Sequence, residues 1–169
     1  MKQTKFLTVF AVFDSETQIK LKSLQDKILD LGYEGSQTMD IPFHISLGSF
    51  PVECAKDLTD KIKTVCSQTK EFKIRLNNIN HFNNTVLFVE PTENTELQAL
   101  HDLFDNNFAD GFPWHAHATI FCEEADKVAR ASEVVESVFE PFEAKIIGIQ
   151  MGEFFPTKIL VDETFIKSI

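Results

Sequence analysis

Two short stretches of the sequence, His44-Ile45-Ser46-Leu47 and His117-Ala118-Thr119-Ile120, share one pattern: a histidine, any residue, a hydroxyl residue and an aliphatic residue. On a β-strand, residues i and i+2 point to the same face, so each histidine projects together with its hydroxyl residue. If the two strands meet at one cleft, two imidazoles and two hydroxyl groups surround a single small anion. A phosphate fits such a cleft well.

The segments around the first stretch predict the order strand, helix, strand, helix, strand. The run Phe6–Phe13 is apolar and rich in β-branched and aromatic residues, which is typical of a central strand. A helix follows, because Ser15-Glu16-Thr17-Gln18 has capping-box spacing and apolar residues recur at helical intervals up to Gly32. The other expected elements are a strand at 44–50, a helix after Pro51 and a half-exposed strand at 72–77.

The second part of the chain repeats this order. We expect strands at 86–89 and 117–122, helices around 97–104 and 128–138, and two final strands at 144–150 and 158–161. No low-complexity linker separates the two parts. The pattern therefore predicts two lobes packed on each other in a single bilobal domain over residues 1–169, with approximate repeat halves at 5–80 and 84–165. His81 falls in a loop-like run and His101 on a predicted helix, so neither is expected to have a catalytic role.

The charge balance argues against one class of partner. Among 169 residues, 16 are basic and 26 acidic, a net charge of −10, and only Arg75 and Arg130 are arginines. Duplex DNA is not an expected partner, because tight nonspecific binding to it needs a broad basic field. No apolar run is long enough to span a membrane, and no leader is expected at the N-terminus. Three cysteines without metal-ligand spacing favour reduced thiols, and we expect a cytoplasmic monomer.

Two histidines on either side of a phosphodiester suit acid–base hydrolysis. An ordinary imidazole pKa of about 6.5 allows one ring to be neutral while the other is protonated. One imidazole then takes a proton from water and the other protonates the departing ribose oxygen, while the hydroxyl groups hold the nonbridging oxygens. This chemistry needs no metal.

The sequence resembles the two-histidine (2H) phosphoesterase superfamily, in its branch of 2'-5' RNA ligases and 2',3'-cyclic phosphodiesterases. The resemblance covers essentially the whole chain and includes Pro42-Phe43 before the first stretch, the middle strand ending near His81-Phe82, the strand Val86–Pro91 and the helix Leu97–Phe104. It implies a bilobal α+β fold with a pseudo-twofold duplication, in which two mainly antiparallel sheets form a central groove flanked by helices.

The resemblance also implies roles for four residues. His44 and His117 are the implied acid–base pair, and Ser46 and Thr119 the implied phosphate-binding residues. Family members open cyclic phosphates, and some join or cleave 2'-5' linkages, without a cofactor. The implied substrate is a small nucleotide or RNA-end phosphodiester. Long RNA fits less well, because the chain is acidic and poor in arginine.

Other interpretations remain open at this point. His115 lies two residues before His117, so a third imidazole is placed to approach the cleft, and Trp114 is a further auxiliary candidate. Trp114, Phe154 or Phe155 is suited to stack on a base. His44, His115 and His117 form an alternative three-imidazole metal site. A non-catalytic module that binds a nucleotide or RNA end on the same fold is the alternative function.

Overall fold

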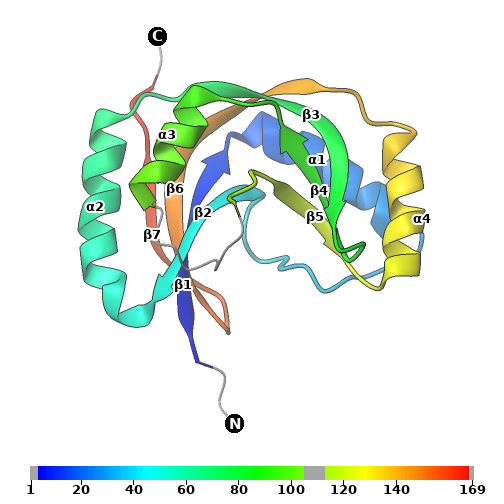
Figure 1. The fold of residues 1–169 in the computed structure, drawn as a ribbon, viewed down its shortest axis with the longest axis horizontal. Coiled ribbons are helices and arrows are strands. Elements are labelled where there is room, and N and C mark those ends of the chain that lie inside the picture. The colour runs from blue at the N-terminus through cyan, green and yellow to red at the C-terminus, as the bar shows by residue number, and fades with distance from the viewer. Residues whose placement is uncertain (1–3, 105–112, 168–169) are drawn as a thin grey trace.

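The structure is a computed structural model that describes residues 4–104 and 113–167 of the chain (Figure 1). Its strands are β1 (Phe6–Phe13), β2 (His44–Pro51), β3 (Phe72–Phe82), β4 (Val86–Pro91), β5 (Ala118–Cys122), β6 (Phe142–Phe154) and β7 (Lys158–Thr164). Its α-helices are α1 (Ser15–Leu29), α2 (Ala55–Gln68), α3 (Thr95–Phe104) and α4 (Ala125–Glu136), and a short 3₁₀ helix (Val52–Cys54) precedes α2.

The strands form one hydrogen-bonded sheet in the order β2-β1-β6-β3-β4-β5, with β7 paired to β6. All pairings between these strands are antiparallel, which confirms the predicted α+β class. The two expected sheets are joined through β6, whose first part pairs with β3 and whose second part pairs with β1. The third strand of each expected half, β3 or β6, thus pairs with the first strand of the other half.

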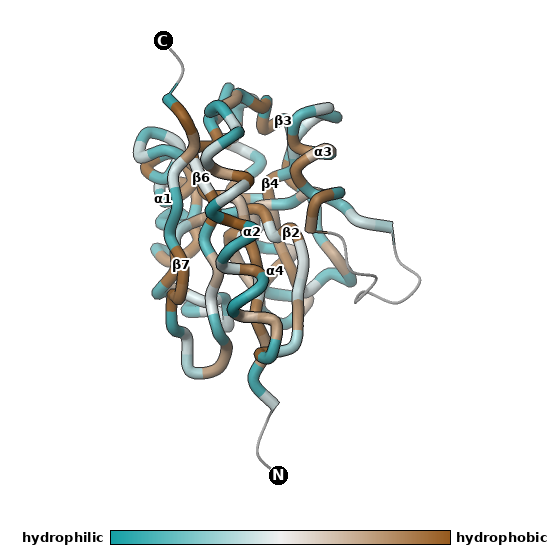
Figure 2. The backbone as a smooth tube through the Cα atoms, turned by 90° about the vertical axis from the view of Figure 1, so that its left-hand side faces the viewer, coloured by the Kyte–Doolittle hydropathy of each residue, from teal (hydrophilic) through white to brown (hydrophobic). Residues whose placement is uncertain are grey.

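Apolar residues of the strands and helices meet in one continuous core. On β1, Leu7, Val9 and Phe10 are fully buried, as expected of a central strand. The hydrophobic segments follow the strands through the interior, whereas the helices alternate between hydrophobic and hydrophilic residues (Figure 2). Each helix therefore covers the sheet with one apolar face and presents polar residues to solvent. In Figure 1, α2 and α4 lie at opposite sides of the molecule, with β2 and β5 between them.

Two local expectations are wrong. His81 lies in β3, not in a loop, because β3 continues to Phe82 and turns into β4 through Asn83 and Asn84, whose φ angles are 48° and 60°. Asparagine tolerates this left-handed conformation, which suits a tight hairpin. The cap of α1 is Asp14 rather than Ser15, since the Asp14 side chain accepts a hydrogen bond from the backbone N–H of Thr17.

No helix in the described ranges is long and apolar enough to cross a membrane. Cys66 is buried, Cys54 and Cys122 are half-buried, and all three are free thiols.

Candidate active site

The two predicted stretches lie on the two end strands of the sheet order, which the curvature of the sheet brings side by side (Figure 1). His44 is the first residue of β2, and His117 immediately precedes β5. A hydrogen bond joins the two segments: the indole N–H of Trp114 donates to the carbonyl oxygen of Ser46 over 3.1 Å. The structure thus brings both stretches to one region.

Each stretch has the same register against its neighbouring strand. Ser46 pairs with Phe10 on β1, and Thr119 pairs with Phe88 on β4. In both places the register shifts, because β2 and β5 each contain one residue more than the partner strand. This additional residue is the aliphatic one that follows the hydroxyl residue. Phe10 and Phe88 are fully buried, and their rings lie 4.4 Å and 5.2 Å from the rings of His44 and His117 respectively.

Both imidazoles are held by the same kind of hydrogen bond. Nδ1 of His44 lies 2.8 Å from the carbonyl oxygen of Pro42, and Nδ1 of His117 lies 2.8 Å from the carbonyl oxygen of His115. Because a carbonyl oxygen only accepts, each Nδ1 must carry the hydrogen. When neutral, each ring therefore has its lone pair on Nε2, which is free to take or return a proton.

The surroundings lower the pKa of both histidines. Burial has the largest effect on His44; the bond to the Pro42 carbonyl opposes it, and the charge of His117 lowers the pKa further. Burial also lowers the pKa of His117. There the bond to the His115 carbonyl and the negative charge of Glu90 oppose burial, while the charge of His115 adds to it. Both rings are therefore more easily neutral than an exposed histidine.

A pocket of about 810 Å³ opens beside this pair. His44, Ser46 and Thr119 line it, which places one imidazole and both hydroxyl groups on a single cavity. The rest of its wall comes from β1, α1, the segment 36–43, Cys122 of β5 and the end of β6 with Phe155. His117 does not line this pocket but lies close enough for its charge to act on His44.

Two glutamines of α1 hold the backbone beside both stretches. The side chain of Gln18 donates to the carbonyl oxygen of Phe43 over 2.8 Å and accepts from the Phe43 N–H over 2.9 Å. Gln25 donates to the carbonyl oxygen of Ile120 over 2.9 Å. Gln18 and Gln25 are seven residues apart, or about two turns of helix, so one face of α1 reaches both segments.

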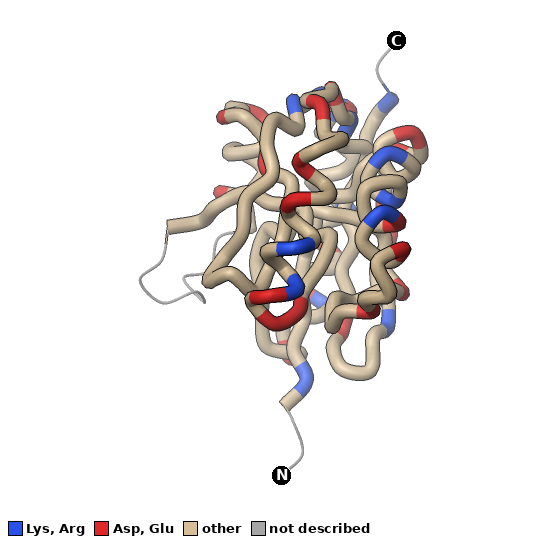
Figure 3. Tube along the Cα trace, turned by 90° about the vertical axis from the view of Figure 1, so that its right-hand side faces the viewer, with Lys and Arg blue, Asp and Glu red and all other residues tan. Residues whose placement is uncertain are grey.

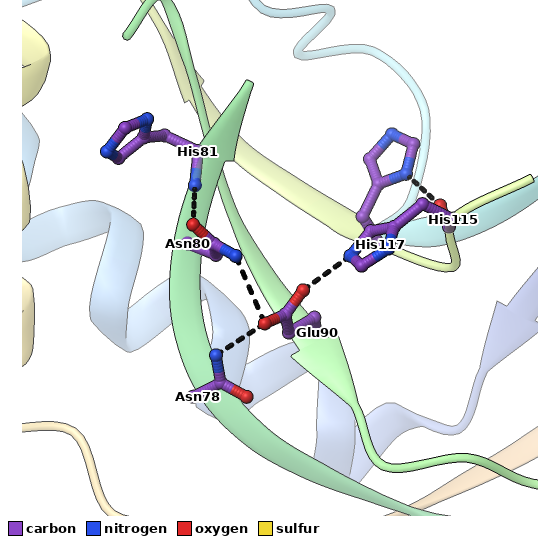
Figure 4. A network of polar contacts seen from close by, with 6 residues as sticks. All are labelled: Asn78, Asn80, His81, Glu90, His115 and His117. Carbon is purple, nitrogen blue, oxygen red and sulfur yellow. Dashed lines mark hydrogen bonds and ion pairs between the residues drawn. The ribbon is translucent and has the colours of Figure 1, made fainter. Parts of the chain in front are cut away.

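A polar network lies beside His117 (Figure 4). Nε2 of His115 bonds to one carboxylate oxygen of Glu90, and the other oxygen accepts hydrogen bonds from the side chains of Asn78 and Asn80. Burial alone would raise the pKa of Glu90, but the hydrogen bonds from Asn78, His115 and Asn80 together lower it. The predicted third imidazole thus approaches the site but is bound to a carboxylate.

Trp114, the other auxiliary candidate, already stacks on another residue of the protein. Its ring is stacked on His101 of α3, with 4.0 Å between ring centroids and an angle of 13°. His101 is 7% exposed and therefore part of the packing, not a surface residue. Phe154 is also buried, whereas Phe155 is 53% exposed at the pocket rim.

The three imidazoles of the alternative metal site are not grouped as metal ligands. Within residues 4–104 and 113–167, no three His, Cys, Asp or Glu side chains are grouped so that they could hold a metal ion. Among the residues that the structure describes, Lys and Arg are interspersed with Asp and Glu, as the view from the right-hand side of Figure 1 shows (Figure 3).

Sequence reasoning missed Glu90, Asn78, Asn80 and the two glutamines of α1. Glu90 carries a weak signal, since it is a charged residue at the end of the apolar run 86–89. The other contacts join residues far apart in the chain and have no local pattern.

A family model described as "2'-5' RNA ligase superfamily" matches residues 33–153. Among solved structures, TT0787 of Thermus thermophilus is similar with a TM-score of 0.62 at 14% identity, covering 97% of this chain and 100% of that one. E. coli LigT complexed with ATP gives 0.60 at 14% identity, covering 98% and 99%, and its complex with 3'-AMP gives 0.57 at 12%, covering 96% and 99%. No curated protein matches the sequence. At these identities the solved structures establish the shared fold.

Proposed function

The chain belongs to the 2'-5' RNA ligase superfamily, and from this premise we propose that it is a metal-independent phosphoesterase. In this proposal it hydrolyses a 2',3'-cyclic phosphate or a related phosphodiester of a small nucleotide or RNA end. One observation carries the proposal: His44 and His117 have matching positions, each with Nδ1 bonded to a carbonyl oxygen two residues earlier and a hydroxyl residue two positions later.

This arrangement supports acid–base catalysis by the two imidazoles. Nε2 of one ring removes a proton from water as the water oxygen bonds to phosphorus. Nε2 of the other ring gives its proton to the ribose oxygen as the bond from phosphorus to that oxygen breaks. The product is a phosphomonoester with one free ribose hydroxyl. Ser46 and Thr119 donate hydrogen bonds to the nonbridging oxygens, where charge increases in the transition state.

The pocket supports a substrate with one compact organic group. Its rim includes Ile19, Met39 and Phe155, three large apolar residues that are exposed by 70%, 54% and 53%. A nucleobase that stacks on Phe155 would cover part of this apolar surface. One structural neighbour, E. coli LigT, has been solved in complex with ATP, 3'-AMP and NADP+, all of them nucleotides. The acidic surface, with its interspersed charges, favours such small substrates over duplex DNA or long RNA.

We also propose that residues 5–80 and 84–165 are copies of one unit. The equal register shifts at Ser46 and Thr119 support this, as does the exchange of β3 and β6 between the halves. In this arrangement each copy contributes one histidine and one hydroxyl residue to a single site.

The test is hydrolysis of 2',3'-cyclic nucleotides, and of short RNA with a cyclic phosphate end, in the presence of EDTA. His44→Ala and His117→Ala are each expected to remove nearly all turnover, and the double variant to lose little more, because the two histidines act as a unit. His81→Ala is the matched control, since His81 is exposed on β3 and outside the site. Tight nucleotide binding without turnover by the folded protein would favour a non-catalytic binding module.

A further inference from the structure

The two candidate catalytic histidines have the same hydrogen bond but different residues to supply it. His44 is anchored on the carbonyl oxygen of Pro42, and His117 on that of His115. A proline fixes its own φ angle through its ring, so the backbone at position 42 is restrained by covalent structure. Position 115 has no such restraint and lies outside regular secondary structure.

Side-chain contacts hold position 115 instead. The His115 ring is bonded to Glu90 on β4, and Glu90 is bonded in turn to Asn78 and Asn80 on β3. The ring also lies edge-on to Phe82 and Phe88, with centroids 5.7 Å away in both cases. His115 is thereby attached to the β3–β4 hairpin (Figure 4).

We propose that Glu90, acting through His115, is a positioning residue for His117. By fixing the His115 side chain it fixes the His115 carbonyl oxygen, which keeps the hydrogen of His117 on Nδ1 and leaves Nε2 for the phosphodiester. Glu90 thus does for the second histidine what the ring of Pro42 does for the first. This inference rests on the proposed function for its kinetic consequence, but not for its structural one.

Burial and charge agree with this role. The Glu90 side chain is 13% exposed, and its pKa is lowered by its hydrogen bonds, so it remains a carboxylate at neutral pH. Glu90, His115 and His44 are the titratable groups that interact electrostatically with the His117 ring. The negative charge of Glu90 raises the pKa of His117, whereas the positive charge of His115 lowers it.

The direct test is the tautomer of each histidine, read from ¹⁵N chemical shifts of the imidazole rings. In the native protein we expect both neutral rings to carry hydrogen on Nδ1. In Glu90→Ala, the signals of His117 should move toward a mixture of tautomers while those of His44 stay unchanged. His44 is the internal control, because its anchor, Pro42, makes no contact with Glu90 among those described. This readout does not depend on turnover.

A second variant covers the case in which Glu90→Ala fails to fold. His115→Ala keeps the backbone carbonyl but removes the anchored ring, which is about half exposed, and it should produce the same change at His117. The two variants should shift the pKa of His117 in opposite directions: down without Glu90 and up without His115. These shifts report the two charges, whereas the change of tautomer shared by both variants reports the loss of positioning.

Kinetics then connects the geometry to the reaction. Misplacement of a catalytic group by about 1 Å costs on the order of 100-fold in rate, so kcat of Glu90→Ala should fall by about 10-fold to 100-fold with little change in KM. Glu143→Ala, at an exposed carboxylate on β6 that pairs with Lys73, is the matched control and should be unaffected.

An unchanged His117 tautomer in both Glu90→Ala and His115→Ala would overturn the inference. A changed tautomer in a protein without phosphoesterase activity would instead refute only the proposed function.

Discussion

Gln25, at the buried face of α1, donates a hydrogen bond to the carbonyl oxygen of Ile120, 2.9 Å away. Ile120 is the extra residue where the register between β4 and β5 shifts, immediately after Thr119. A bulged residue is left out of the regular ladder, so its backbone groups need other partners. Gln25 supplies one and thereby ties the second hydroxyl residue to the helix.

Gln25→Leu is therefore expected to destabilise the protein. The change leaves a buried carbonyl oxygen without its partner, which costs about 1–3 kcal/mol of the free energy of unfolding. Urea denaturation followed by circular dichroism measures the loss. Gln98→Leu, a comparable change on α3 where the amide bonds an exposed aspartate, is the control and should cost much less. Equal losses in both variants would show that the contact with Ile120 contributes nothing specific.

Removal of one hydroxyl group is expected to reduce catalysis more than binding. Ser46→Ala and Thr119→Val each take away a donor aimed at charge that forms in the transition state, and loss of one such donor costs about 10²–10³ in kcat. Thr119→Ser keeps the hydroxyl group and should keep most of the activity. Steady-state kinetics on a 2',3'-cyclic nucleotide provides the measurement. If Thr119→Val is as active as Thr119→Ser, the threonine is there only for its strand propensity.

Phe155 is expected to determine how well a nucleobase is held. Stacking of a base on an aromatic side chain is worth about 1–3 kcal/mol, so Phe155→Ala should raise KM by about 10-fold or more while kcat changes little. Phe155→Tyr keeps the stacking surface and should behave like the native protein. Leu160→Ala, at an exposed apolar residue on β7 outside the pocket, is the control. An unchanged KM in Phe155→Ala would place the base elsewhere.

Local patterns in the sequence predict most of the fold, because strand alternation and helical periodicity depend on near neighbours. They also place His44 with Ser46, and His117 with Thr119, since residues i and i+2 share a strand face. Alternation alone ends the strand β3 at Asn77, because asparagines favour turns and here only the last two of them form one, whereas the resemblance places its end near His81-Phe82, where β3 does end.

The remainder of the site depends on which strands become neighbours. Glu90 meets Asn78 because β3 and β4 pair in one particular register, and Gln25 meets Ile120 because α1 crosses to the second half of the chain. Such contacts are fixed by long-range packing, which periodicity does not encode. The exchange of β3 and β6 between halves has the same origin: a strand's sequence shows that it is buried, but not which partner it joins.

Finally, the stability of the protein is expected to fall as the pH drops below neutrality. The pKa of His44 is lowered in the folded protein, while in the unfolded chain it returns to about 6.5. Between these two values the unfolded state binds a proton that the folded state does not, so stability present above about pH 6.5 is lost as the pH falls. The slope reaches at most about 1.4 kcal/mol per pH unit for each such histidine. His117, whose pKa is also lowered, adds to the effect.

Urea denaturation between about pH 7.5 and about pH 5 measures this loss of stability above the range in which carboxylates titrate. His44→Gln removes one titrating ring and should show a smaller slope than the native protein, whereas His81→Gln should show the native slope. Equal slopes for all three proteins would mean that His44 accepts its proton as readily folded as unfolded, and that burial does not keep this imidazole neutral.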